Sequence, residues 1–123
     1  MPTAIIEITP YHAEVHFDNL VIQTGSEETP SPFQLLLASL GSCVGLNAAG
    51  YCENHQLPTE GLRVIMEVER DPDTRLASLI KMKLVPPEGF PENRKRALLK
   101  AAEACFVKRH FTKPPRFETT LVE

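Results

Sequence analysis

The sequence predicts an α+β domain in which a strongly curved antiparallel sheet holds one long, buried central helix. Residues 32–52 carry no charged side chain and place small or apolar residues on every face, as a buried helix does. Several shorter segments alternate apolar and polar residues with the period of two that is typical of strands. A second helical pattern spans residues 91–110. Together these patterns predict the order β-β-β-α-β-β-α-β in a single domain, residues 1–123.

Three short strands are expected at the N-terminus. Residues 3–9 have strand composition, and residues 12–17 alternate apolar with His or Glu side chains. Asp18 and Asn19 form a hairpin turn that tolerates positive φ, and residues 20–23 return as the paired strand. Because these strands are too small to bury both their faces, we expect a partner subunit to complete them.

The central helix begins at Pro32, a residue well suited to a first helical turn. About 20 apolar residues suffice to cross a bilayer, so a transmembrane span is the alternative. Gln34 and Asn47 interrupt the apolar run, and no basic flank follows it. A core helix wrapped by strands is therefore favoured, and no membrane partner is expected.

The second half of the chain predicts a hairpin, a helix and a last strand. Residues 62–70 and 77–85 alternate cleanly on either side of a turn at residues 71–73. In residues 91–110, one apolar stripe at helical spacing consists of Leu98, Ala101, Ala102 and Cys105. Two prolines end that helix, and residues 117–122 alternate as the final strand.

Composition excludes several functional classes. A formal net charge of −3 and a pI near 5.8 give no electrostatic case for nucleic-acid binding. Nothing at the N-terminus is typical of a signal peptide, so a cytoplasmic protein is expected. In that compartment the three cysteines should begin as thiols, and no C-x-x-C pair is present.

The cysteines are the residues best suited to chemistry. Cys43 and Cys105 fall on faces of two helices that should be buried, and only tertiary structure can bring them together. Packed helices lie close enough for a disulfide, although two cysteines on helices are more often inert packing residues. Cys52 lies half a helical revolution from Cys43 and is expected to pack in the core. No short ligand spacing supports a zinc site formed by the cysteines and a histidine, so no metal is expected.

Two motifs resemble those of a known family. The first runs from Pro30 through Leu35-Leu36-Leu37-Ala38-Ser39-Leu40-Gly41-Ser42 to Cys43, and the second is Ala101-Ala102-Glu103-Ala104-Cys105-Phe106-Val107, followed by two prolines. Their separation and the order of elements between them are similar to those of the OsmC/Ohr family. The resemblance covers nearly the whole chain. It implies an OsmC-like fold, with two subunits intertwined as a homodimer.

The resemblance also implies an activity, the thiol-dependent reduction of organic hydroperoxides in oxidative-stress defence. By this analogy Cys43 is the peroxidatic thiolate and Cys105 the resolving thiol, and their disulfide is reduced by an external dithiol without a cofactor. An apolar pocket formed by Leu36, Leu40 and Leu46 is expected to favour organic hydroperoxides over hydrogen peroxide.

The chain departs from the family pattern at the residues that activate the thiolate. No Arg precedes Arg63, whereas active members carry an N-terminal arginine, and Phe33 and Gln34 stand where they carry a glutamate. The second motif lacks the usual Cys-Pro-x-Ser. Side chains that could supply a substitute cation are Lys81, Lys83, Lys108, Arg109, His12 and His16. These departures favour the alternative, a non-catalytic dimeric module that binds a small apolar ligand.

Overall fold

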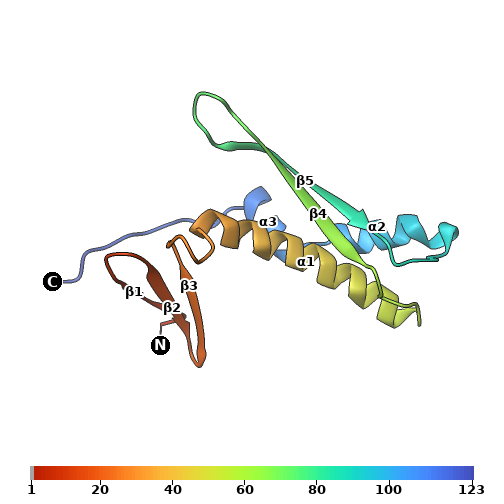
Figure 1. Ribbon diagram of the computed structural model, residues 1–123, viewed down its shortest axis with the longest axis horizontal. Coiled ribbons are helices and arrows are strands. Elements are labelled where there is room, and N and C mark those ends of the chain that lie inside the picture. Colours follow the sequence, from red (N-terminus) through yellow and green to blue (C-terminus); the bar gives the residue numbers. More distant parts are fainter. Residues whose placement is uncertain (1) are drawn as a thin grey trace. The chain divides into compact units, whose positions relative to one another are not determined.

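The computed structural model describes residues 2–123, which form two compact units, one reaching to Ala38 and the other running from Ser39 to Glu123. The first unit contains β1 (Ile5–Ile8), β2 (Ala13–Phe17) and β3 (Leu20–Thr24), hydrogen-bonded as one antiparallel sheet in the order β1-β2-β3 (Figure 1). Asp18 has φ 47° in the β2–β3 turn. The three N-terminal strands and their turn are confirmed.

The long helix α1 (Pro32–Asn54) begins with a capping box. The Ser31 N–H donates to Gln34 Oε1 at 2.9 Å, and the Gln34 N–H donates to Ser31 Oγ at 3.1 Å. This reciprocal pair satisfies two backbone donors that a helix start otherwise leaves open. Gln34 therefore caps the helix.

The helix α1 is buried along one stripe, not on every face. Its buried residues are Leu40, Val44, Ala48 and Cys52, spaced four apart. The expectation of a fully buried helix is wrong for the single chain, because half-buried and exposed residues flank this stripe. By length and composition α1 could cross a membrane, and the core helix of a soluble protein passes the same test.

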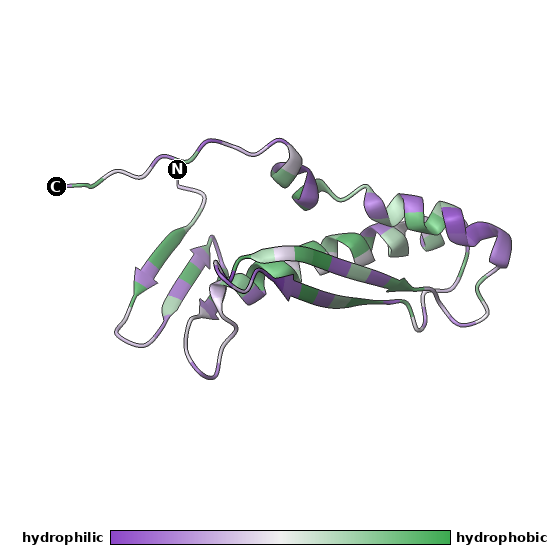
Figure 2. Ribbon diagram, turned by 90° about the horizontal axis from the view of Figure 1, so that it is seen from above, coloured by the Kyte–Doolittle hydropathy of each residue, from purple (hydrophilic) through white to green (hydrophobic). Residues whose placement is uncertain are grey.

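The strands β4 (Arg63–Arg70) and β5 (Ala77–Val85) form the predicted antiparallel hairpin. Figure 2 shows the alternation of apolar and polar residues along both strands. The apolar side of β4 packs on α1 at its glycines: a Cβ at Gly41 would lie 2.8 Å from Met66 Sδ, and one at Gly45 would lie 3.5 Å from Val64 Cγ2. Small residues in α1 thus allow β4 to approach closely.

The second predicted helix is broken. A 3-10 turn, η1 (Glu92–Arg94), leads into α2 (Lys95–Glu103), and α3 (Phe106–Thr112) follows after Ala104 and Cys105 leave the helical conformation. Cys105 has extended backbone angles (φ −85°, ψ 115°), and its sulfur accepts the Lys108 N–H at 3.3 Å. The side chain caps α3, a local arrangement that competes with helix continuation.

Two further expectations about the sheet are wrong for the single chain. The described strands form two separate sheets, β1-β2-β3 and β4-β5, instead of one curved sheet. Residues 117–122 are not a strand, and Phe117 is 86 % exposed. A strand needs a neighbouring edge for its hydrogen bonds, and no strand in the described chain pairs with this segment.

The core of the second unit joins α1 to the C-terminal helices. Its buried members are Val44, Ala48, Cys52, Phe90, Leu98, Ala102 and Cys105. Cys43 and Val107 are partly buried and pack against this cluster. The core therefore brings the middle of α1 against the break between α2 and α3.

Candidate active site

The thiols of Cys43 and Cys105 lie in hydrogen-bonding contact. Cys43 comes from the middle of α1 and is half-buried, whereas Cys105 comes from the α2–α3 break and is fully buried. Both are free thiols. The tertiary fold thus joins two cysteines that are far apart in the sequence.

One polar contact fixes the break against α1. Asn47, one turn after Cys43, donates from Nδ2 to the Ala104 carbonyl oxygen at 2.7 Å. That carbonyl no longer has a helical partner because the helix stops there. Asn47 thus holds the residue next to Cys105 in register with Cys43.

The two thiols differ in acidity. The pKa of Cys43 is lowered, first by a hydrogen bond from the Val107 N–H, then by the Cys105 thiol, with smaller contributions from the Phe106 N–H and the Arg109 charge; together these outweigh its desolvation. The pKa of Cys105 is raised, first by burial and also by its interaction with the Cys43 sulfur. At a given pH below both pKa values, Cys43 is the more ionised of the pair, and Cys105 holds its proton.

Cys52 does not belong to this pair. It is fully buried in the core, and burial raises its pKa. The sequence suggested a packing role, and its position in the core agrees with that role.

Of the six suggested cations, Arg109 is the one whose charge lowers the pKa of Cys43. Lys81 and Lys83 instead form ion pairs across the hairpin, with Glu69 at 3.3 Å and Glu67 at 2.8 Å. The two histidines, His12 and His16, interact with glutamates of the first unit. Lys108 contributes a backbone N–H to the Cys105 sulfur.

An open pocket of about 310 Å³ has Leu40 in its wall, one helical turn before Cys43, and neither thiol lines it. Leu40, Phe111 and Lys108 belong to its wall, together with the β5 residues Ala77, Ser78, Leu79, Ile80 and Met82. Of the three leucines expected to line a pocket, Leu40 does so here. Leu46 is 71 % exposed, and Leu36 is half-buried in the first unit.

Sequence reasoning missed Asn47 and the backbone N–H of Val107. Asn47 had a signal, since it is an isolated amide in a run without charges. The Val107 N–H had none, because its direction depends on the helix break.

Comparison with known proteins identifies the family. A family model described as OsmC-like protein matches residues 25–120, and the chain therefore belongs to the OsmC-like family. At the level of the family, membership implies a part in osmotic-stress or peroxide defence. No curated protein sequence matches significantly.

Solved structures share the fold at low identity. One is a candidate osmotic stress induced and detoxification response protein from Psychrobacter arcticus, with 18% identity and a TM-score of 0.76 over 89% of this chain and 87% of that one. Another is an OsmC like protein from Mycoplasma pneumoniae, with 11% identity and a TM-score of 0.74 over 90% and 86%. A hypothetical protein from Aquifex aeolicus has 18% identity and a TM-score of 0.76 over 90% and 86%. The mixed α+β fold with antiparallel sheets and three helices is thus that of OsmC-like structures.

Proposed function

We propose that this protein reduces organic hydroperoxides, with Cys43 as the peroxidatic thiolate and Cys105 as the resolving thiol. The observation that carries the proposal is the opposite direction of the two pKa shifts within one pair of touching thiols. A nucleophilic thiol must be ionised and reachable, and Cys43 has the lowered pKa and the partial exposure. A resolving thiol must lie within reach of the sulfenic acid, and the Cys105 thiol contacts Cys43.

The reaction balances with these two residues and one external reductant. The Cys43 thiolate attacks the distal peroxide oxygen and the O–O bond breaks, so that Cys43 becomes a sulfenic acid. The alkoxide that leaves takes up from solvent the proton that Cys43 released on ionising, and becomes the alcohol. The Cys105 sulfur then attacks the Cys43 sulfur and releases water, forming a disulfide. An external dithiol reduces that disulfide and becomes a disulfide itself. No cofactor takes part in these steps.

Other groups of this chain stabilise the Cys43 thiolate in place of the family's arginine and glutamate. Gln34, at the glutamate position, is occupied in capping α1. The Val107 and Phe106 N–H groups and the Arg109 charge act on Cys43 instead. Neutral amide donors stabilise a thiolate less than a paired guanidinium does, so we expect a slower peroxidase than members that keep the arginine.

The pocket beside the pair favours an organic substrate. Leu40, Ile80, Met82 and Phe111 provide an apolar surface one turn from Cys43. Burial of a hydrocarbon group there contributes about 25 cal/mol per Å² of apolar area, a gain that hydrogen peroxide cannot make. Alkyl and aryl hydroperoxides are therefore the substrate class.

A homodimer in the cytoplasm completes the proposal. The first sheet leaves Ile8 76 % exposed, and the alternating segment 117–122 lacks a strand partner in the described chain. A second copy would cover the apolar face and offer a strand edge. Sedimentation equilibrium should give twice the chain mass, and removal of residues 117–123 should shift the protein towards the monomer.

A non-catalytic module that binds a small apolar ligand is the second candidate. The observation favouring it is the apolar pocket itself, together with the family Arg and Glu that this chain lacks. In that case the thiols would oxidise slowly and without selectivity.

One experiment separates the two candidates. The reduced protein is treated with one equivalent of cumene hydroperoxide, and free thiols and intact mass are followed. The peroxidase loses two thiols and two hydrogens rapidly through a Cys43–Cys105 bond. Cys43→Ser abolishes the reaction, and the matched control Cys52→Ser leaves its rate unchanged. Oxidation that is slow and spread over all three cysteines contradicts the proposal.

A further inference from the structure

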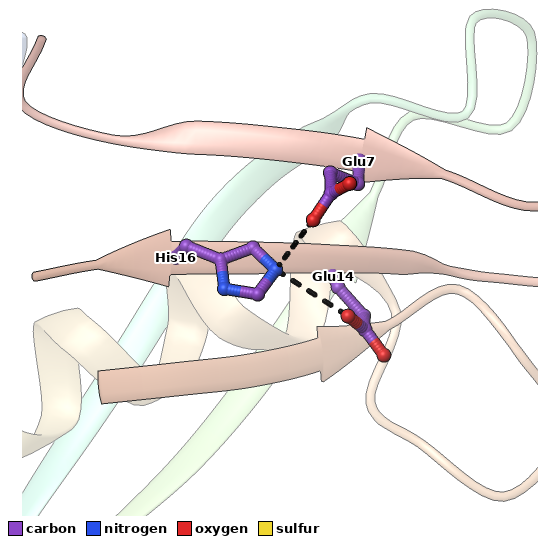
Figure 3. A group of neighbouring side chains, drawn as sticks. All are labelled: Glu7, Glu14 and His16. Atoms are coloured by element: carbon purple, nitrogen blue, oxygen red, sulfur yellow. Dashed lines mark ion pairs between the residues drawn. The ribbon is translucent and has the colours of Figure 1, made fainter. Parts of the chain in front are cut away.

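One face of the β1-β2-β3 sheet gathers histidine and glutamate side chains. His12 comes directly before β2, and Glu14 and His16 lie within β2 at alternate positions after it. Glu7 of β1 is the direct cross-strand partner of Glu14. Residues paired in antiparallel strands project to the same face. Figure 3 shows Glu7 and Glu14 converging on the His16 ring.

From this geometry we infer that Glu7, Glu14 and His16 bind a divalent transition-metal ion, with Zn²⁺ as the probe. His16 Nε2 lies 3.0 Å from Glu7 Oε1 and 3.3 Å from Glu14 Oε1, and the three ligand atoms all lie within 4.8 Å of one another. Ligands about 2.0–2.1 Å from a tetrahedral ion are roughly 3.4 Å apart. The side chains therefore need only small rotations to receive the ion.

The orientation of His16 fits an ion better than a simple pair. Its Nε2 atom is buried and makes no hydrogen bond among the described residues, although two carboxylate oxygens are within 3.3 Å. The two oxygens flank the nitrogen without either accepting a hydrogen bond from it. Donor atoms around a shared ion have this flanking arrangement, because the ion itself lies on the axis of the nitrogen lone pair.

His12 supports the site from the side. The Thr9 hydroxyl donates to the His12 carbonyl oxygen at 3.1 Å, so its Oγ1 can accept from His12 Nδ1, 3.0 Å away. That tautomer leaves a lone pair on His12 Nε2, which is also buried without a hydrogen-bond partner and lies 3.8 Å from Glu14 Oε2. His12 is thus a ready fourth ligand beside Glu14.

The chemistry of the donors sets the class of ion. An imidazole nitrogen suits Zn²⁺ and its neighbours in the first transition row, and two carboxylates neutralise the divalent charge. The Glu7 side chain is 68 % exposed, so water can complete the coordination. The site lies wholly in the first unit, and the inference does not rest on the proposed peroxidase activity.

The test uses the intact, reduced protein and Zn²⁺ alone. Imidazole NMR during a Zn²⁺ titration should shift the rings of His12 and His16 together and saturate at one equivalent, while His55 and His110 of the second unit serve as internal controls. Perturbation of all four rings in parallel, or of none at micromolar protein and metal, overturns the inference.

Calorimetry of variants assigns the ligands. Glu14→Gln and His16→Ala should each remove one Zn²⁺ equivalent. His12→Ala removes only the supporting ligand, so it should weaken Zn²⁺ binding about 10–100-fold. The matched controls His110→Ala and Glu118→Gln, both exposed in the second unit, should bind as the unsubstituted chain does. Thiols contribute equally to every titration because all variants keep the cysteines. Unchanged binding by Glu14→Gln shows that His16 and its glutamates form an ion pair only.

Discussion

Replacing Asn47 by alanine should loosen the break that carries Cys105. The substitution removes the 2.7 Å hydrogen bond to the Ala104 carbonyl, which contributes about 1 kcal/mol net. Alanine also raises helix propensity by up to about 0.7 kcal/mol, so the total change in unfolding free energy is small. The matched control Asn54→Ala, exposed at the end of the same helix, has only the propensity gain. The difference between the two variants should therefore be about 1 kcal/mol.

Urea unfolding measures that difference, and peroxide chemistry measures its consequence. A loss of about 1 kcal/mol lowers the equilibrium constant for contact between the two thiols about five-fold. Disulfide formation after one equivalent of cumene hydroperoxide should slow by up to that factor, and with excess hydroperoxide more Cys43 should reach the sulfinic acid. Equal stability and equal disulfide rates in Asn47→Ala and Asn54→Ala would refute the positioning role.

Three other substitutions test separate contacts. Gly41→Ala should gain less than the roughly 1 kcal/mol of its helix propensity in urea unfolding, because the flexible Met66 side chain must move away. In a Met66→Ala background the same change should stabilise by the full amount, and an equal effect in both backgrounds contradicts the packing argument. Thr24→Val should cost about 1–2 kcal/mol, because this buried hydroxyl donates at 2.6 Å to a loop carbonyl; an unchanged urea midpoint would argue against that contact. Arg109→Gln should raise the pKa of Cys43, because the guanidinium charge favours the thiolate. Alkylation of Cys43 at a pH below that pKa should therefore slow, and a lowered pKa would contradict the assignment.

Local patterns predicted the parts of the fold that depend on local chemistry. The alternation in residues 62–70 and 77–85 identified the β4–β5 hairpin, and the charge-free run identified α1. The two cysteines were singled out as a candidate pair, and their meeting depends on the core that packs the middle of α1 against the α2–α3 break.

Features that depend on tertiary contacts could not be predicted from the sequence. The stripe ending in Cys105 has helical spacing, but the sulfur caps α3 and the helix breaks there. The alternation of residues 117–122 describes a strand without saying which edge receives it. The glutamate partners of His16 come from cross-strand register, which a single strand pattern does not contain.

Competitive alkylation tests the central claim, the unequal acidity of a touching thiol pair, most directly. The reduced protein is treated with limiting iodoacetamide across a pH series, and each cysteine is quantified by peptide mass. Cys43 should take most of the label at every pH below the ordinary thiol range, with Cys105 and Cys52 protected by burial and raised pKa. Labelling of Cys105 or Cys52 as fast as Cys43 would contradict the account.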